Sequence, residues 1–362
     1  MKILHTEWIR TKGGQSMRVL EDLKIIEELG HTPYLACRKE SWLYEEAVGR
    51  GFETFALPFG HLADPKPYIE MVRLIRRLDA EIIHTHSSKD SYPATYAAKL
   101  LGKKVVRSRH IELTKKPGHL FRLADRIVTT GERIKEELLG YGLLAQKVVS
   151  IPTYPDAGRF TPSAKRRRDF RQELGIGADT VVIGTMAGAG RRKRGWALVE
   201  MMPSILQEHP DTLLLIAGDS RGSAAQKLQE RIGALALQNR VRFVGYTRPE
   251  TFLDGIDIYA CPSEKEGLPQ ALMQAMMMGK ACLSTDVGSI RELNVAENLL
   301  LADKEDLAGF EAQLRRLAGD KAAVRRLGEA NRRLALERFN RDIMKAKTGR
   351  LYGDLAEGDN RG

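Results

Sequence analysis

The chain has 362 residues, and its 58 lysines and arginines outnumber its 47 aspartates and glutamates, giving a formal net charge of +11. With 43% hydrophobic and 29% charged residues it can bury ordinary cores, which excludes global disorder. The longest apolar runs, such as residues 213–217, are far shorter than the roughly 20 residues of a membrane span. The basic excess indicates acidic partners such as nucleotides, anionic lipids or nucleic acid.

The N-terminus and the cysteines both indicate a cytoplasmic protein. Residues 1–10 (MKILHTEWIR) lack the apolar stretch of a secretory signal. The cysteines, Cys37, Cys261 and Cys282, are odd in number and widely spaced, which argues against a disulfide framework or a cysteine-type zinc site. We therefore expect a reducing, cytoplasmic location.

Short apolar runs alternate with amphipathic stretches, a pattern typical of parallel α/β layers. Strands are expected at Lys2–His5, Thr32–Ala36, Glu53–Leu57, Glu81–His86, Lys104–Ser108, Arg126–Thr130, Val148–Ile151, Val181–Met186, Thr212–Ala217, Val241–Val244, Ile256–Ala260 and Ala281–Thr285. Helices are expected at Gln15–Leu29, Tyr68–Leu78, Tyr92–Leu101, Arg133–Leu139, Trp196–Gln207, Ala224–Leu237, Pro249–Leu253, Gln270–Met278, Asp306–Ala318 and Lys321–Phe339. The alternation predicts two doubly wound sheets.

Residues 151–170 (IPTYPDAGRFTPSAKRRRDF) hold three prolines and a basic run and are interpreted as a linker. The predicted fold class is therefore α/β, with two doubly wound, Rossmann-like domains that face a central cleft. The first domain is expected at residues 1–156 and the second at 157–339. Ligands of such sheets bind beyond the carboxyl ends of the strands, so we look for functional residues there.

A glycine pair, Gly13 and Gly14, follows the first strand and precedes the first helix. Glycines at this point let the backbone approach a phosphate, and a helix N-terminus supplies N–H groups. The alternative is an ordinary turn between a strand and a helix.

His84 and His86 share one face of a strand because side chains alternate along it. His86 stands at the carboxyl end, where an imidazole can donate to a hydroxyl or a phosphate. The alternative is a structural histidine, which is the interpretation favoured for His84. A metal site would need a third ligand, and no acidic residue or cysteine stands at a suitable spacing.

The segment after the fifth strand is basic and includes Arg109, His110 and Lys115. It could bind an anionic acceptor or lie on an anionic membrane, where each basic residue contributes about 1 kcal/mol. The alternative is a solvated basic face. The segment lacks the repeated aromatic residues of single-strand nucleic-acid platforms, so no nucleic-acid partner is expected.

Residues 188–195 (GAGRRKRG) follow the first strand of the second half. Lys193 occupies the third glycine position of a dinucleotide fingerprint, which disfavours a dehydrogenase. Arg191 and Arg194, with the cations between them, could hold a diphosphate, since arginine grips phosphate through two N–H groups. The alternative is a solubilising turn.

Residues 263–293 (SEKEGLPQALMQAMMMGKACLSTDVGSIREL) are the most informative stretch. Pro269 stands where a helix can begin, and Gln270 and Gln274 lie one helical turn apart. Glu266 precedes this helix, at a loop position from which a carboxylate can accept hydrogen bonds from sugar hydroxyls. Met276–Met278 are interpreted as core.

With this stretch the chain resembles the family 4 glycosyltransferases of the GT-B fold, in particular those of bacterial lipopolysaccharide and envelope polysaccharide synthesis. The resemblance extends over nearly the whole chain, through KGG near the N-terminus, the HTH strand end, IPTYPDAGRFTP, LLIAGD and VRFVGY. Three features depart from the family pattern. Its second glutamate is Gln274 here, and in its glycine-rich turn the arginine position is Ala189 and the lysine position Arg194. Lys280-Ala281 replaces the usual pair of a small residue and proline, a change interpreted as structural.

The resemblance implies roles for individual residues. His86 and Glu266 are the expected catalytic residues. The expected donor-binding residues are Gly13, Gly14, Arg191, Arg194, Gly267, Leu268 and Gln274. Arg109, His110 and Lys115 remain the candidates for the acceptor. The first domain would bind the acceptor, together with a C-terminal helix at about 340–362, and the second domain the nucleotide-sugar.

The resemblance also implies a reaction: transfer of a sugar from a nucleotide diphospho-sugar, with retention and without a metal or another cofactor. The basic segments favour an anionic glycolipid or oligosaccharide acceptor, such as lipopolysaccharide core or another envelope glycan. Such an acceptor would associate the protein peripherally with the inner face of the cell membrane. A non-catalytic glycosyltransferase-like partner and a nucleotide-sugar epimerase of the same fold are the alternatives.

Overall fold

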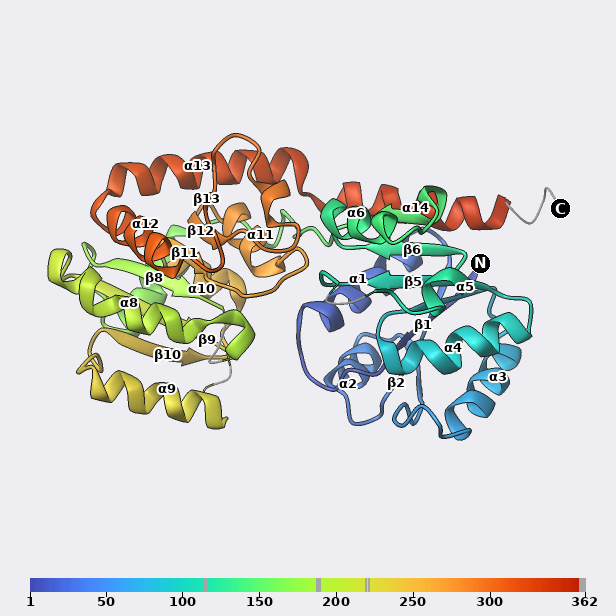
Figure 1. Ribbon diagram of the computed structural model, residues 1–362. Coiled ribbons are helices and arrows are strands. Elements are labelled where there is room, and N and C mark those ends of the chain that lie inside the picture. Colours follow the sequence, from blue (N-terminus) through green and yellow to red (C-terminus); the bar gives the residue numbers. More distant parts are fainter. Residues whose placement is uncertain (114–115, 187–189, 219, 221, 358–362) are drawn as a thin grey trace. The chain divides into compact units, whose positions relative to one another are not determined.

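The computed structural model describes residues 1–113, 116–186, 190–218, 220 and 222–357, without the side chain of Arg191. The chain forms two compact units. Unit 1 comprises Met1–Thr153 and Asp342–Gly362, and unit 2 comprises Tyr154–Arg341. Figure 1 shows a sheet flanked by helices in each unit.

Unit 1 is built on a parallel sheet with the strand order β3-β2-β1-β4-β5-β6-β7. Its strands are β1 (Lys2–Glu7), β2 (Thr32–Cys37), β3 (Glu53–Ala56), β4 (Ile82–Thr85), β5 (Lys104–Arg109), β6 (Arg126–Thr129) and β7 (Val148–Ser150). The strand order reverses between β1 and β4, where His5 pairs with His84 in register. Such a reversal is the switch point at which doubly wound sheets hold their ligands.

The helices of unit 1 cover both faces of this sheet. They are α1 (Gly14–Glu28), α2 (Trp42–Gly49), α3 (Lys66–Leu78), α4 (Ser88–Leu100), α5 (Leu120–Leu123), α6 (Glu132–Gly140) and α14 (Arg341–Glu357), with a 3₁₀ turn at Ala145–Lys147. Val19 of α1 and Leu43 of α2 belong to one apolar core, while Met71 of α3 and Ala97 of α4 belong to another. Helix α14 returns from the far end of the sequence and buries Tyr352 completely.

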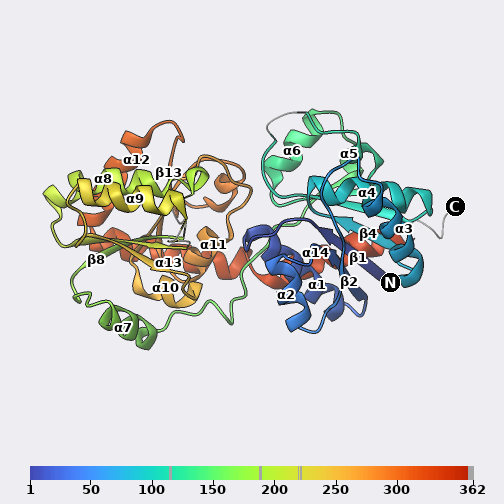
Figure 2. The same ribbon diagram turned by 90° about the horizontal axis from the view of Figure 1, so that it is seen from below.

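Unit 2 repeats the design with the strand order β10-β9-β8-β11-β12-β13. Its strands are β8 (Val181–Thr185), β9 (Thr212–Ala217), β10 (Val241–Gly245), β11 (Ile258–Cys261), β12 (Ala281–Thr285) and β13 (Leu300–Ala302). Its helices are α7 (Ala164–Glu173), α8 (Gly195–Glu208), α9 (Ser223–Ala234), α10 (Pro249–Gly255), α11 (Gln270–Met277), α12 (Leu307–Gly319) and α13 (Lys321–Arg338), with 3₁₀ turns at Arg191–Lys193 and Ile290–Leu293. Figure 2 shows α8, α9 and α12 on one side of the sheet and α10, α11 and α13 on the other. The switch point of this sheet lies between β8 and β11.

These sheets confirm the predicted fold class, because each unit is a parallel, doubly wound, Rossmann-like domain. The units divide at residues 153 and 154 and again at 341 and 342, whereas the sequence placed the boundaries at 156 and 339. No helix in the described part of the chain is long and apolar enough to cross a membrane.

The linker expected at 151–170 is wrong in its second half, where α7 forms. Ser163 caps this helix by accepting from the N–H of Arg166, and Phe170 is buried. Two arginines of the basic run form ion pairs within unit 2, Arg166 with Asp254 at 2.6 Å and Arg167 with Asp257 at 2.7 Å, and Arg171 of the same helix also pairs with Asp257. These arginines, which the sequence placed in a linker, therefore form ion pairs that hold α7 against the rest of unit 2. The three-residue strand β13 was also missed, because so short a run carries no periodicity.

Candidate active site

Polar residues gather where three neighbouring strands of unit 1 end. β1 ends at Glu7, His86 follows β4, and Arg109 and His110 stand at the end of β5. The carboxyl ends of parallel strands share one edge of the sheet, so these side chains lie together at the switch point. The sequence predicted three of these four residues as part of the site.

Hydrogen bonds fix the turn between β4 and α4. Ser87 and Asp90 form a capping box at the start of α4. Asp90 Oδ2 also accepts from the N–H of His86 at 3.2 Å and from the hydroxyl of Thr6 at 2.7 Å. Gln15, in the first turn of α1, donates to the carbonyl of His86 at 3.3 Å and to Ser87 Oγ at 2.6 Å. The start of α1 and His86 are therefore held together within unit 1.

Four histidines meet behind this edge. His86 Nε2 lies 2.8 Å from His5 Nδ1, and His86 Nδ1 lies 3.2 Å from His110 Nε2. The rings of His84 and His86 are stacked, with centroids 4.5 Å apart. Tyr352 of α14 places its hydroxyl 2.7 Å from His84 Nδ1 and 3.3 Å from His5 Nε2. His5 and Tyr352 were not predicted, because nothing in the local sequence connects them with the HTH strand end.

Burial keeps these imidazoles neutral. Burial lowers the pKa of His5, and likewise that of His110, from the ordinary 6.5 to about 3. It also lowers the pKa values of His84 and His86 well below 6.5. His86 is only 4% exposed. A neutral imidazole has one N–H donor and one lone pair, so each ring can donate one hydrogen bond and accept another.

His5, His84 and His86 are close enough together to chelate a metal ion. His5 would be the third ligand, which the sequence analysis did not find. The observed geometry is that of hydrogen bonding instead. His5 Nδ1 and His86 Nε2 point at each other at 2.8 Å, whereas coordination to one metal needs lone pairs that converge on a common point. His84 Nε2 is bonded to Ser108 Oγ at 2.8 Å.

Gly13 and Gly14 are exposed at the start of α1. Gly13 has an extended backbone with φ −170°, and neither glycine has a positive φ. A Cβ built at either position would meet no atom within 4 Å. The fold itself therefore does not require glycine here, which favours the interpretation that these residues leave space for a ligand against the backbone.

Strand β5 carries two arginines near its carboxyl end, the buried Arg107 and the half-buried Arg109. Arg109 Nη2 donates to the carbonyl of Glu112 at 2.9 Å, but its Nε has no partner in the described part of the chain. Arg107 is 8% exposed, lies 4.4 Å from the ring centroid of Phe121, and leaves Nε and Nη1 without described partners. Burial lowers the pKa of Arg107 to about 10. Lys115 lies outside the described residues.

Unit 2 places a charged cluster at the equivalent edge of its sheet. Glu266 follows β11, is 6% exposed, and forms an ion pair through Oε1 with Lys193, which follows β8. Oε1 also accepts from the hydroxyl of Ser263 at 2.8 Å. The other oxygen, Oε2, has no partner among the residues that the structure describes. The sequence predicted Glu266, but from the basic turn it named Arg191 and Arg194 as donor-binding residues and not Lys193.

The backbone around Glu266 is held from two sides. The N–H of Glu264 donates to the carbonyl of Arg192 at 2.9 Å, which ties the acidic loop to the basic turn. The N–H of Ser289 donates to the carbonyl of Gly267 at 2.8 Å. Gly288 has φ +55°, and a Cβ there would lie 2.5 Å from the carbonyl oxygens of Glu266 and Gly267. Only glycine permits this close approach.

The other predicted donor residues lie around this cluster in different ways. Arg194 adopts a left-handed conformation before α8, and its Nη1 donates to the carbonyl of Lys304 at 2.5 Å. Leu268 packs into the core, so only its backbone could meet a ligand. Gln274 is half-buried on α11, with no described partner for its amide. Ala189 and the Arg191 side chain lie outside the described part.

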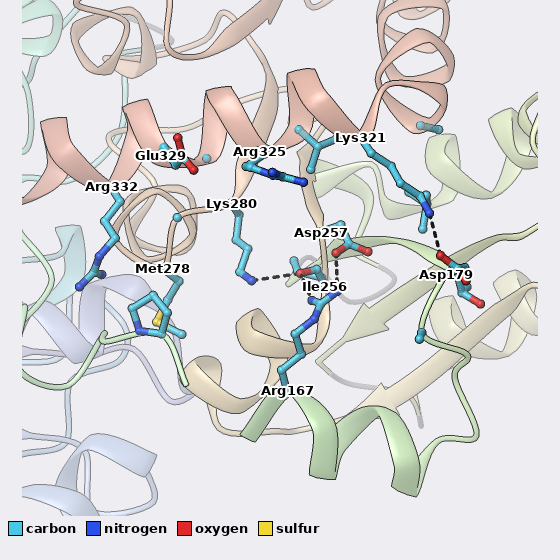
Figure 3. A pocket seen from close by; sticks show the side chains of 18 residues that line it. Arg167, Asp179, Ile256, Asp257, Met278, Lys280, Lys321, Arg325, Glu329 and Arg332 are labelled. Atoms are coloured by element: carbon cyan, nitrogen blue, oxygen red, sulfur yellow. Dashed lines mark hydrogen bonds and ion pairs between the residues drawn. The ribbon is translucent and has the colours of Figure 1, made fainter. Parts of the chain in front are cut away.

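A pocket of about 560 Å³ lies at the opposite edge of this sheet, where β8, β11 and β12 begin (Figure 3). None of the predicted site residues lines it. Three of its cations bond to carbonyls at helix ends: Arg167 and Lys280 each donate to that of Ile256 after α10 at 3.1 Å, and Arg332 donates to that of Met277 at the end of α11. Lys321 pairs with Asp179. Most cations of the pocket therefore have structural partners, so the site is assigned to the carboxyl edge.

Two doubly wound domains, each with a polar cluster at the switch point of its sheet, form the architecture of the GT-B type. Residues 12–159 match the family model described as Glycosyltransferase Family 4, and residues 166–334 match the model described as Glycosyl transferases group 1. The two ranges together span most of the chain. The protein belongs to this family of glycosyltransferases, as the sequence motifs indicated.

Curated relatives include enzymes of envelope glycan synthesis. The chain is 22% identical over 345 residues to the UDP-Gal:alpha-D-GlcNAc-diphosphoundecaprenol alpha-1,3-galactosyltransferase of Escherichia coli, covering 89% of each chain. It is 28% identical over 247 residues to the D-inositol 3-phosphate glycosyltransferase of Corynebacterium jeikeium, covering 65% of this chain and 58% of that protein. It is 26% identical over 202 residues to the lipopolysaccharide core biosynthesis mannosyltransferase LpsB of Rhizobium meliloti, covering 52% and 57%. The matches thus span little more than half the length of the last two.

Solved structures agree on the fold. A glycosyltransferase from Rickettsia africae superposes with a TM-score of 0.86 at 18% identity, covering 98% of both chains. Anabaena Alr3699/HepE, solved in complex with UDP-glucose, superposes with a TM-score of 0.85 at 17% identity, covering 98% of this chain and all of the other. At such identities the likeness establishes the GT-B fold alone.

Proposed function

We propose that this transferase moves a sugar from a nucleotide diphospho-sugar to an anionic glycolipid or oligosaccharide of the cell envelope, with retention at the anomeric carbon. Lipopolysaccharide core and lipid-linked polysaccharide precursors are the acceptor classes proposed. The observation that carries the proposal is the Glu266 cluster of unit 2, a buried carboxylate that is fixed by a cation and a hydroxyl and keeps one oxygen for a ligand.

The donor is proposed to bind along this cluster. Glu266 Oε2 can accept from a sugar hydroxyl, while Lys193 lies beside it, where a diphosphate charge would need a cation. Helix α11 begins at Gln270 without a side-chain cap, and its N-terminal N–H groups favour an anion. Gln274 on the same helix can bond a ribose hydroxyl. UDP-glucose in the Anabaena structure supports a nucleotide-sugar of this kind.

The acceptor is proposed to bind on unit 1. Arg107 and Arg109 hold buried N–H groups that lack described partners, and a phosphate or carboxylate would satisfy them. The Escherichia coli and Rhizobium meliloti relatives, a diphosphoundecaprenol galactosyltransferase and a lipopolysaccharide core mannosyltransferase, support a lipid diphosphate or a lipopolysaccharide core. Such an acceptor would bring the protein to the inner face of the membrane as a peripheral protein.

The proposed mechanism is electrostatic. Lys193, Arg194 and the start of α11 stabilise the charge that develops on the departing diphosphate, and a positioned group of this kind is worth several kcal/mol. The leaving phosphate takes the proton of the attacking acceptor hydroxyl on the same face of the sugar, which gives retention. His86 holds a hydroxyl near the reacting carbon. No step in this scheme uses a metal or another cofactor.

Binding of the donor tests this proposal against the non-catalytic alternative, which Gln274 in place of a glutamate keeps open. Thermal unfolding is measured with UDP, GDP, ADP and their sugars in buffer containing EDTA. A ligand at 100 times its dissociation constant adds about 2.7 kcal/mol to the free energy of unfolding. A selective shift by one nucleotide supports the proposal, and the absence of any shift contradicts it.

A further inference from the structure

The buried histidines of unit 1 form one continuous chain of hydrogen bonds. The chain runs from His110 through His86, His5, Tyr352 and His84 to Ser108. It connects β1, β4 and β5 with α14, which begins more than 230 residues after the end of β5. Each nitrogen of the three inner histidines has a partner within it.

The proton positions along this chain are correlated. When one neutral imidazole donates to the next, the second ring must carry its own proton on the far nitrogen and donate onward. The chain therefore has two self-consistent states, in which all donors point toward Ser108 or all point toward His110. A change at any link reverses the tautomer of every imidazole beyond it.

The distances around Tyr352 favour one of the two directions. Hydroxyl donors form shorter hydrogen bonds than N–H donors. The hydroxyl lies 2.7 Å from His84 Nδ1 but 3.3 Å from His5 Nε2, so the phenol donates to His84 and accepts from His5. His5 then accepts at Nδ1 from His86 Nε2–H. His86 is left with a lone pair on Nδ1, on the side of His110.

From this chain we propose that His5 and Tyr352 are positioning residues that hold His86 as its Nε2–H tautomer. Its Nδ1 is then an acceptor, which takes a hydrogen bond from His110 Nε2–H in the free protein and from a substrate hydroxyl in its place when substrate binds. The inference rests on the proposed function only for the role of His86 toward substrate, because the tautomer itself is a property of the free protein. The C-terminal helix α14 is thus part of the catalytic apparatus of unit 1 through one phenolic oxygen.

Removing that oxygen tests the inference. In Tyr352→Phe the imidazole of His5 loses its acceptor at Nε2 and is expected to carry its proton on Nδ1, which forces His86 to Nδ1–H. Ser108→Ala acts from the other end of the chain and is expected to cause the same reversal. Thr348→Val is the matched control, since Thr348 is a buried residue of α14 whose hydroxyl has no described partner.

The tautomers are read from long-range ¹H–¹⁵N spectra of histidine-labelled protein without substrate, with His86→Gln used for assignment. We expect Nε2–H at His86 in the wild type and Thr348→Val, and Nδ1–H in Tyr352→Phe and Ser108→Ala. An Nδ1–H wild type, or a tautomer unchanged in both variants, overturns the inference. Because the spectra need no turnover, this result stands even if the proposed function fails.

Kinetics test the link to catalysis. Correct imidazole tautomers can be worth up to about 10⁴-fold in kcat, and we expect Tyr352→Phe to lower kcat about 10- to 100-fold with KM for the donor unchanged. Thr348→Val is expected to leave both unchanged. A reversed tautomer with wild-type kcat overturns the positioning role, whereas a wild type without transfer contradicts the proposed function instead.

Discussion

The two units place polar clusters at the same point of the same architecture, the switch point of a parallel sheet, but build them from different chemistry. In unit 1 neutral imidazoles bond to one another, and the nitrogens of His5, His84 and His86 are all engaged. In unit 2 a carboxylate and an ammonium pair directly, and the carboxylate keeps one oxygen for a ligand. A neutral network orients groups, whereas a charged cluster stabilises charge. The comparison assigns orientation to unit 1 and charge stabilisation to unit 2.

The largest effect is expected from Glu266→Ala in unit 2. This change removes the sugar contact and leaves Lys193 without its carboxylate, so kcat for transfer should fall about 10²- to 10³-fold while nucleotide affinity changes little. Turnover is measured by release of nucleoside diphosphate in the presence of acceptor. Glu264→Ala, an exposed residue of the same loop, is the control. Unchanged turnover in Glu266→Ala would remove the role assigned to this cluster.

A second prediction separates the cations of the basic turn. Lys193→Ala is expected to weaken binding of nucleoside diphosphate about tenfold, which is the effect of losing one charge-assisted hydrogen bond, and to spare nucleoside binding. Arg194→Ala should act in the same direction by a smaller factor, because that guanidinium bonds to the Lys304 carbonyl. Titration calorimetry measures both ligands. Equal losses for nucleoside and diphosphate would argue against a phosphate contact.

The glycine pair of unit 1 gives a smaller effect. Gly14→Ala is expected to weaken donor binding several-fold, because the added methyl group occupies the open space beside the backbone. The melting temperature should stay equal or rise slightly, since alanine favours a helix over glycine. Gly49→Ala, also in a helix with open space around it, controls for the backbone effect. A loss of stability specific to Gly14→Ala would indicate a structural role.

The smallest effect on activity is expected from pH. Because burial lowers the pKa values of His5 and His110 to about 3, their titration should change kcat less than twofold between pH 8 and pH 6. In the unfolded chain these two histidines have a pKa of 6.5, and in the folded chain their pKa is about 3. The unfolded chain therefore binds more protons between these values, so the free energy of unfolding falls as pH decreases through this range.

Chemical denaturation at several pH values measures this loss of stability. His5→Gln should reduce the slope of the free energy of unfolding against pH between pH 6.5 and pH 3. The variant is needed because burial raises the pKa values of Glu7 and Asp90. Titration of these two carboxyl groups therefore changes the free energy of unfolding in the opposite direction and partly hides the effect of the histidines in the wild type. An unchanged slope in His5→Gln would contradict the neutral state of the imidazole chain.

The sequence predicted most strands to within one or two residues, because buried parallel strands appear as short apolar runs. Glu266 was predictable as well, since its loop and helix form one contiguous motif. Lys193 was not, because four adjacent cations give no local sign of which one faces a carboxylate. His5 and Tyr352 were missed for a related reason: their partners lie about 80 and 270 residues away, and only the folded sheet brings them together.

The central claim, that the chain transfers a sugar with retention, is tested most directly by slow donor hydrolysis, which needs no acceptor. Each nucleotide-sugar is incubated with the protein in EDTA, and ¹H spectra record the products as they form. We predict release of nucleoside diphosphate and of a sugar that first appears with the anomeric configuration of the donor, and loss of both in Glu266→Ala. Inverted or epimerised sugar, or no cleavage of any donor, would contradict the account.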